Sequence, residues 1–357
     1  MCNNNSYELI KKLSCTFGPS GCESFVTKLI EEILKSKNLP VTPKYDKLGN
    51  LTVELKSGKE NAKKLMLSAH TDEVGFMVTE ISESGYLKID TVGGISPEVV
   101  AGRHVTVLTK EGFIDGIISS KAIHHKDRED RLKPEKIKNL YVDIGAKDGD
   151  EAKELCQIGD YLTFSPNFKY FGKNDRFITS KALDDRLGCA ILIELLERLN
   201  DNVDSLPLDL YFCFTTREEV GISGATVAAN TIRPDYAVVL ETTAVADIAG
   251  VPESQKVAKL GEGGVISLMD RSTIYDRGLI DLMLETAKEN GIKAQIKKFV
   301  SGGNDAGHIH KSTTGVRTLA LSAPTRYLHS PNCVASLDDY DAMLELLYKF
   351  ILTEKLK

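Results

Sequence analysis

Apolar residues recur at helical spacing near the start of the chain. Residues 7–13 and 25–34 carry apolar side chains every three to four positions, which predicts two helices separated by a Gly- and Pro-containing break at 18–21. Short apolar runs follow at Leu51–Leu55 and at residues 64–69, KLMLSA. The second run has the length and two-sided apolarity of a central strand in an open α/β sheet, and it ends directly on His70.

The pattern changes between Gly75 and Phe164. Strand-like pieces such as FMVTEI, YLKIDTV and HVTVLT alternate there with Gly-containing turns, and no strongly amphipathic helix is evident. This stretch predicts a small, barrel-like β-rich domain at 75–165, inserted into a larger domain formed by residues 1–74 and 166–357.

After Ser180 helical and strand patterns alternate again. A helix is predicted from Asp184 to Leu199, followed by the strands LDLYFCFT and YAVVLE, a helix near Leu279–Asn290, the strand RTLALSA and a last helix from Leu337. Because parallel strands need crossover helices, the alternation predicts an α/β fold with a mixed, mostly parallel sheet and helices on both faces.

Composition narrows the classes of partner. The 357 residues include 45 Lys plus Arg against 51 Asp plus Glu, for a net charge of −6, and they contain no basic block, so nucleic acid is not expected as a partner. No apolar run reaches the roughly 18 residues that span a bilayer, and the first residues lack the pattern of a signal peptide. The seven cysteines, an odd number without a CxxC pair, suit reduced thiols in a cytoplasmic protein.

Acidic residues and histidines stand where predicted strands end, the edge at which open α/β sheets bind ligands. His70 and Asp72 are separated by one residue, so in an extended chain they point to the same face, which suits a histidine metal ligand oriented by a carboxylate. Asp184 and Asp185 open a predicted helix. Helix capping explains many such acids, and a carboxylate that bridges two cations is the alternative.

Further acids follow two other strands. Glu218 and Glu219 point in opposite directions in an extended chain, so one can ligate a metal while the other reaches substrate or water. The nearby Gly224 leaves room for a close approach of backbone. Glu241 ends another apolar strand, and His329 follows a strand and a turn.

Five residues on separate segments form a nitrogen and oxygen ligand set: His70, Asp184, Glu219, Glu241 and His329. Two histidines and three carboxylates suit zinc, cobalt or manganese and do not suit thiolate-bound structural zinc. With one carboxylate bridging, each of two cations receives one histidine and one private carboxylate, which leaves positions open for a shared water. This is the pattern of a two-metal hydrolase.

Several segments also carry a family resemblance, and they run from about residue 13 to about residue 340: AHTDEVGFMV, VGGI, LYVDIGAKDGDEA, IGDYLTF, SKALDDRLGCA, EEVGISGA, GGNDAG and APTRYLHSP. With them the sequence resembles the dinuclear metallo-aminopeptidases that form tetrahedral dodecamers, the glutamyl and deblocking aminopeptidase family, some members of which are labelled endoglucanases or cellulase M-like.

The resemblance implies a role for each candidate residue. It makes His70 and Glu241 ligands of one metal, His329 and Glu219 ligands of the other, and Asp184 the bridge. It makes Asp72 the residue that holds the His70 imidazole, and Glu218 the general base. Many relatives carry Asp where this chain has Glu241. Both residues offer a carboxylate ligand, but the side chain of Glu241 is longer by one methylene.

The resemblance also implies the wider biochemistry. It implies a zinc-peptidase-like fold, two divalent cations per subunit (zinc or cobalt, with manganese also suited), short peptide substrates, no nucleic acid, no membrane, and dimers that assemble to a dodecamer through the inserted domain. The expected reaction is removal of N-terminal amino acids from peptides by a metal-activated water. His308, in GGNDAGHIH, is a candidate substrate-binding residue.

Three other readings remain open. An endoglucanase-type glycoside hydrolase would also use paired carboxylates, but it needs no histidine ligands, and this chain has no Trp and only 7% aromatic residues. A metallo-acylase or carboxypeptidase on a related sheet would use similar ligands. A non-catalytic scaffold would lack ligands or the base, whereas all six positions are occupied here.

Overall fold

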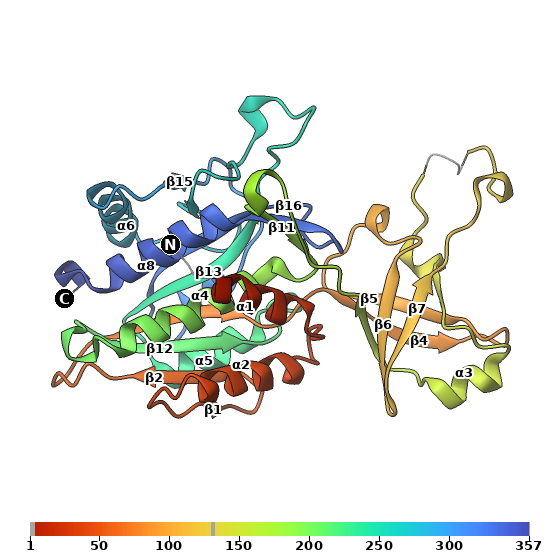
Figure 1. Cartoon of the computed structure of the whole chain (residues 1–357), viewed down its shortest axis with the longest axis horizontal. Helices are drawn as coiled ribbons and strands as arrows, with labels where there is room; N and C mark the ends of the chain where they lie inside the picture. The colour runs from red at the N-terminus through yellow and green to blue at the C-terminus, as the bar shows by residue number, and fades with distance from the viewer. Residues whose placement is uncertain (1–3, 130–132, 357) are drawn as a thin grey trace.

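The computed structural model describes residues 4–129 and 133–356, and it shows a large mixed sheet covered by helices beside a closed barrel (Figure 1). The strands of the sheet are β1 (Lys44–Tyr45), β2 (Leu51–Leu55), β3 (Lys64–His70), β10 (Lys169–Phe171), β11 (Phe177–Ser180), β12 (Asp209–Thr215), β13 (Tyr236–Ala244), β14 (Gly264–Ile266), β15 (Ala294–Ile296), β16 (Arg317–Arg326) and β17 (Cys333–Ser336).

The centre of this sheet is parallel and its flanks are antiparallel. The strand order is β1-β2-β12-β3-β13-β16-β17-β11-β10, with β14 and β15 added beside β16. The four strands β12, β3, β13 and β16 run in parallel, and β2, β17 and β14 pair with them in antiparallel fashion. The predicted mixed α/β sheet is therefore confirmed, with its parallel part confined to the central strands.

Helices cover both faces of the sheet. They are α1 (Asn4–Cys15), α2 (Ser24–Ser36), α4 (Leu183–Asn200), α5 (Ser223–Ile232), α6 (Arg277–Glu289), α7 (Ala306–Ile309) and α8 (Leu337–Ile351). Helix α4 lies against β3 and β13 and is itself covered by α1 and α8, while α5 packs on the other side of the sheet (Figure 1). Helix α7 contacts α5 as well as β13 and β16. The position of α4 between the sheet and two helices explains why it is buried along most of its length, including its charged residues Asp184 to Arg186.

The inserted stretch folds into a closed barrel in the order β4-β5-β8-β7-β6-β9. Its strands are β4 (Gly75–Ile81), β5 (Leu87–Val92), β6 (His104–Thr109), β7 (Gly112–Ile118), β8 (Tyr141–Asp143) and β9 (Tyr161–Phe164), and one short helix, α3 (Gly149–Leu155), packs beside β4. The barrel has its own apolar core between Phe76 and Phe164, separate from the core around the sheet. These separate cores support the proposed division into residues 1–74 with 166–357 and an inserted 75–165.

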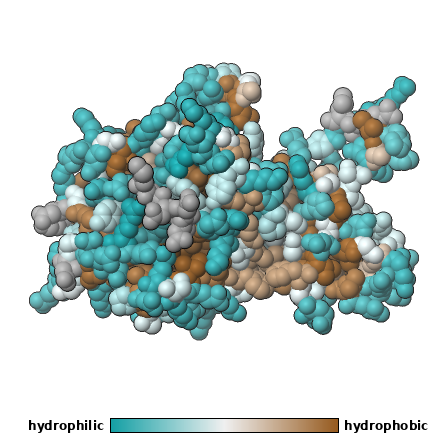
Figure 2. Space-filling model, viewed as in Figure 1, coloured by the Kyte–Doolittle hydropathy of each residue, from teal (hydrophilic) through white to brown (hydrophobic). Residues whose placement is uncertain are grey.

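Polar and apolar contacts join the two bodies. Buried Glu73, which precedes the barrel, accepts hydrogen bonds from Thr163 of β9 at 2.7 Å and from the buried Lys181 ammonium. Apolar residues gather along this seam (Figure 2), where the rings of Phe17, Phe25 and Phe113 pack with centroids 5.2 to 6.1 Å apart. The barrel is thus fixed to the chain segments that surround the end of β3.

Two further expectations concern the cysteines and the membrane. The six cysteines within the described residues are unpaired and Cys156, Cys189, Cys213 and Cys333 are buried, while Cys2 lies outside the described residues. None of the helices in the described part of the chain has both the length and the apolarity of a membrane-spanning helix.

The α/β core generates a stability prediction. Phe350 of α8 is fully buried, so Phe350→Ala should lower the free energy of unfolding by about 3–5 kcal/mol through lost burial and a residual cavity. Phe171→Ala serves as the control, because that ring is 43% exposed and its loss should cost about 1 kcal/mol or less. Urea unfolding measures both variants, and equal losses would contradict the assignment of Phe350 to the core.

Candidate metal centre

The candidate residues lie at one edge of the sheet, where its parallel strands end. His70 is the last residue of β3, and Thr215, its partner across the ladder, ends β12 three residues before Glu218. Val239 of β13 pairs with Ser68, so Glu241, two residues further along, comes level with His70. The loop after β16 supplies His329, and the start of α4 supplies Asp184.

These residues form two groups that share Asp184. The first contains His70, Asp184 and Glu241, and the second contains Asp184, Glu219 and His329; in each group the ligand atoms lie within 4.8 Å of one another. Asp184 directs Oδ1 to His70 Nε2 at 3.3 Å and Oδ2 to His329 Nε2 at 3.3 Å. Its two oxygens therefore face different histidines.

Each group is completed by one private carboxylate. Glu241 Oε1 lies 3.4 Å from His70 Nε2, and Glu219 Oε1 lies 3.1 Å from His329 Nε2. The five residues that sequence spacing selected as a ligand set are thus brought together, in two nitrogen and oxygen groups of the kind that bind zinc, cobalt or manganese.

Main-chain oxygens orient both imidazoles. His70 Nδ1 lies 3.1 Å from the carbonyl oxygen of Asp72, and His329 Nδ1 lies 2.7 Å from the carbonyl oxygen of Gly94. Because Nδ1–H donates to a carbonyl oxygen in each case, Nε2 is the nitrogen directed at the carboxylates, and it is the atom that would ligate a metal in place of its proton. Gly94 belongs to the segment after β5, so the inserted stretch takes part in the site.

The Asp72 side chain contacts the loop after β12 more closely than it contacts His70. Its Oδ1 is 3.5 Å from His70 Nδ1, whereas its two oxygens accept hydrogen bonds from the amides of Glu218 and Glu219 at 3.0 Å. Ser20 Oγ donates to the same carboxylate at 2.5 Å. Asp72 therefore connects the first group to the segment that carries Glu218.

The electrostatics of the cluster are dominated by buried acids. Burial raises the pKa of Glu241 well above its usual value, and the nearby Asp184 raises it further. Burial likewise raises the pKa of Glu218, to which Glu219 adds. For His70, burial alone would lower the pKa, but Glu241, Asp184 and Asp72 raise it well above the ordinary range. A divalent cation would relieve this excess of negative charge.

Sequence reasoning missed a buried acid behind the cluster. Asp305, in the GGNDAG segment, is 1% exposed and accepts hydrogen bonds from Thr215 at 2.7 Å and Ser68 at 3.4 Å, on the two strands beside His70. Burial raises its pKa to about 6. The distinctive GGNDAG segment was the sequence feature that could have drawn attention to Asp305. The sequence alone, however, does not indicate that Asp305 contacts the strands beside His70.

His308 is placed on α7 by the structure. Its Nδ1 lies 2.9 Å from Thr226 Oγ1 of α5, and it belongs to none of the possible metal-binding groups found among residues 4–129 and 133–356. A substrate contact for His308 stays a prediction.

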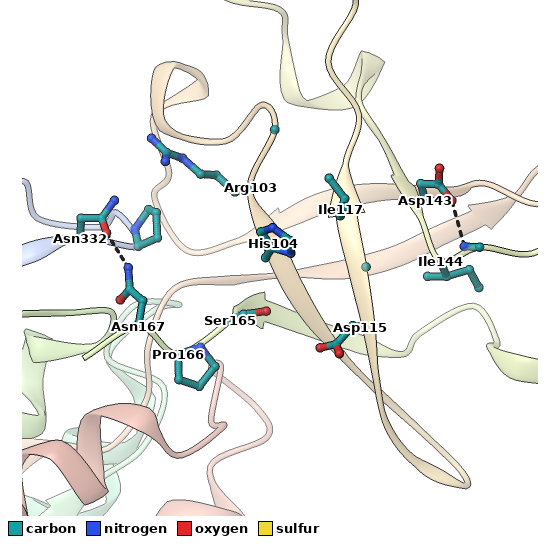
Figure 3. Close-up of a pocket in the computed structure, with 14 residues that line it drawn as sticks. Arg103, His104, Asp115, Ile117, Asp143, Ile144, Ser165, Pro166, Asn167 and Asn332 are labelled. Carbon is teal, nitrogen blue, oxygen red and sulfur yellow. Dashed lines mark hydrogen bonds between the residues drawn. The ribbon is translucent and has the colours of Figure 1, made fainter. Parts of the chain in front are cut away.

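A large pocket lies elsewhere, where the barrel meets the α/β body. This pocket of 760 Å³ is lined by Arg103, His104 and Asp115 from the barrel and by Asn167 and Asn332 from the α/β body, with a hydrogen bond joining the two asparagines (Figure 3). No candidate metal ligand lines it. The chemistry of the cluster is therefore separate from this groove.

Comparison with known proteins gives a consistent family assignment. Residues 49–346 match the M42 glutamyl aminopeptidase family. The chain is 30% identical to a glutamyl aminopeptidase of Lactococcus lactis over 94% of this chain and 92% of that protein. It is 32% identical to a lysyl aminopeptidase of Pyrococcus furiosus over 95% of both chains.

Solved structures agree with the sequence matches. A TET aminopeptidase from a marine sediment Thaumarchaeota archaeon superposes with a TM-score of 0.92 and 34% identity, covering 98% of this chain and 96% of that chain. The Pyrococcus horikoshii TET1 peptidase, which can assemble into a tetrahedron or a large octahedral shell, gives a TM-score of 0.84 and 34% identity, covering 97% and 99%.

One similar structure carries a different name. A Thermotoga maritima protein described as an endoglucanase gives a TM-score of 0.76 and 31% identity, covering 96% of each chain. The family match and the glutamyl and lysyl relatives nevertheless agree on peptide substrates. By this agreement over nearly its whole length, the chain belongs to the M42 glutamyl aminopeptidase family, and it is a metal-dependent aminopeptidase.

Proposed function

We propose that the chain is a dinuclear aminopeptidase in which Asp184 bridges two divalent cations. The observation that carries this proposal is the geometry of Asp184, whose two oxygens lie 3.3 Å from the Nε2 atoms of two different histidines. His70 and Glu241 would complete one site, and Glu219 and His329 the other. Asp72 is proposed to keep the His70 imidazole in place.

The donor set fits such cations. Both histidines direct Nε2 at carboxylates, and the three proposed ligand carboxylates have lost most of their contact with solvent water. Zinc or cobalt suits this mixture of imidazole and carboxylate, and manganese is the further candidate. Bound there, two divalent cations would polarise a peptide carbonyl and lower the pKa of a water toward about 7.

Glu218 is proposed as the general base. It lies within 4.8 Å of ligand atoms of His70 and Glu219, with which it forms a third group that could hold a cation, and it belongs to neither of the two groups that share Asp184. With the two cations held by the groups that share Asp184, its carboxylate would accept a proton from the attacking water and deliver it to the leaving amine. The surrounding acids attract the ammonium group of a substrate N-terminus, which favours cleavage at the first residue of a peptide.

The subunit is proposed to work as part of a homo-oligomer on short peptides. The Pyrococcus horikoshii TET1 peptidase can assemble into a tetrahedron or a large octahedral shell, and the similar PhTET1-12s structure is described as a dodecamer. We propose a dodecamer for this chain, built from dimers that meet through the barrel. The unpaired cysteines of this chain suit a reducing compartment, and we propose the cytoplasm as the location of the protein.

A substrate panel tests the reaction class. With zinc or cobalt supplied, the enzyme should release p-nitroaniline from at least one aminoacyl p-nitroanilide, and N-acetylation of that substrate should abolish release because it removes the charged amino terminus. Carboxymethylcellulose, a soluble cellulose substrate, tests the same enzyme for endoglucanase activity. Hydrolysis of cellulose without hydrolysis of any aminoacyl substrate would overturn the proposal.

Removal of divalent cations is the second test. Prolonged chelation should abolish peptide hydrolysis, and it should lower the melting temperature because the buried carboxylates are left to repel one another. Added zinc or cobalt should restore both properties, and chelator already saturated with calcium is the control. Full activity in a protein with no measurable metal would refute the dinuclear site.

Replacement of Glu218 isolates the base. Glu218→Gln keeps the size of the side chain but cannot accept the proton, so kcat should fall by about 100- to 10,000-fold while metal content stays at two per chain. Glu262→Gln, on an exposed side chain, is the matched control. A fully active Glu218→Gln enzyme would sink this assignment.

A further inference from the structure

The loop that carries Glu218 is held by its backbone amides. Four consecutive N–H groups, from Thr216 to Glu219, each donate to a buried side-chain oxygen on another segment of the chain. Asn50 Oδ1 accepts from Thr216 at 2.8 Å, Glu23 Oε1 accepts from Arg217 at 3.1 Å, and Asp72 accepts from the last two at 3.0 Å. We call Glu23, Asn50 and Asp72 the loop clamp.

Glu23 has no evident purpose in its own helix. It immediately precedes the first turn of α2, but its side chain makes no capping hydrogen bond to that helix. Its carboxylate turns instead to the amides of Gly21, at 2.7 Å, and Arg217. The side chain crosses to a loop almost two hundred residues away in sequence.

The environment of Glu23 argues against a purely stabilising role. The residue is 5% exposed, and no ion pair to it occurs among the described residues. Burial raises the pKa of its carboxyl, and the nearby Asp72 raises it further. A buried carboxylate without a cationic partner is costly, so a role in the adjacent site is the better reason for its presence.

Asn50 secures the other end of the same loop. Its amide Nδ2 donates to Gly224 O at 2.9 Å and to Asp46 at 2.6 Å, while its Oδ1 accepts from both the amide and the hydroxyl of Thr216. A Cβ on Gly224 would lie 2.1 Å from Thr216 O and 2.5 Å from Asn50 Oδ1. The close approach predicted from this glycine is therefore the contact that Asn50 fills.

The loop needs such support because its backbone is strained. Arg217, the residue immediately before Glu218, has φ of 58°, in the left-handed region that side-chain-bearing residues rarely adopt. Its own amide is the group that Glu23 accepts from. Without that acceptor, a relaxed Arg217 would rotate the following residue away from the cluster.

We propose that Glu23 is a positioning residue for the general base, acting through the Arg217 amide, with Asn50 holding the far end of the loop. The proposal rests on the proposed role of Glu218. It requires an oxygen at the end of a three-carbon side chain, and it does not require the charge of Glu23.

Two substitutions of opposite kind test this requirement. Glu23→Gln loses the charge but keeps the acceptor in place, whereas Glu23→Asp keeps the charge and withdraws the oxygen by one methylene. Displacement of a catalytic group by about 1 Å can cost on the order of 100-fold, so Glu23→Asp should lower kcat by about 10- to 100-fold while Glu23→Gln stays within about threefold of the wild type. Glu32→Asp, on the exposed side of α2, is the matched control.

Two readouts separate positioning from loss of folded enzyme. Titration with an amino-acid hydroxamate, which chelates the metals, counts intact sites, so that kcat is expressed per site. Hydrogen–deuterium exchange of the metal-loaded protein follows the amides of residues 216–219 directly, and uptake there should rise in Glu23→Asp alone.

The outcomes are distinct. If Glu23→Asp keeps the wild-type kcat per site and the wild-type exchange, the proposal is overturned. It is also overturned if Glu23→Asp is active and Glu23→Gln is inactive, because charge would then be the relevant property. Failure of the proposed function shows differently, as a fully active Glu218→Gln enzyme or a wild type that cleaves no aminoacyl substrate, while the exchange measurement still reports whether Glu23 holds the loop.

Discussion

The structure depends most on how a buried set of acids is compensated. Asp72, Asp184, Asp185, Glu241 and Asp305 are each less than a tenth exposed, and Glu218 and Glu219 lie beside them. Each ionised group taken out of water costs several kcal/mol unless it is paired, and two histidines do not balance so many carboxyls. Divalent cations bound at the proposed sites would supply the missing positive charge, and the folding of this region would then be linked to metal binding.

The α/β body and the inserted segment both contribute contacts to the buried acidic cluster. Parallel strands deliver His70, Glu241 and the Glu218 loop to one edge, while antiparallel flanks and helices bury what lies behind them. The inserted segment contributes the Gly94 carbonyl that orients His329, and Glu73 links the end of β3 to the barrel through Thr163. The barrel is therefore coupled to the site by hydrogen bonds, in addition to its proposed role in assembly.

Sequence pattern could predict that the candidate ligands lie together, because several of them stand at the ends of recognisable strands. His70 ends an apolar strand, and Glu241 ends another; in a parallel sheet such ends converge, so periodicity was sufficient to bring them together. Asp305 and Glu23 show the reverse. Neither follows an apolar strand, and nothing in the sequence around Glu23 indicates its contact with Arg217. Their partners are 90 and 194 positions away, and local spacing carries no information about such distances.

The sequence by itself determined the family, the mixed α/β sheet with its β-rich insertion, and the types of residue that gather at the sheet edge. Hydrophobic periodicity and strand ends are local properties, and they can be read from neighbouring residues. Only the tertiary structure decided which oxygen of Asp184 faces which histidine, that a carbonyl of the inserted segment orients His329, and that Glu23 holds the Arg217 amide. These details depend on how distant segments pack, because hydrogen bonds act over about 3 Å in space and do not depend on separation along the chain.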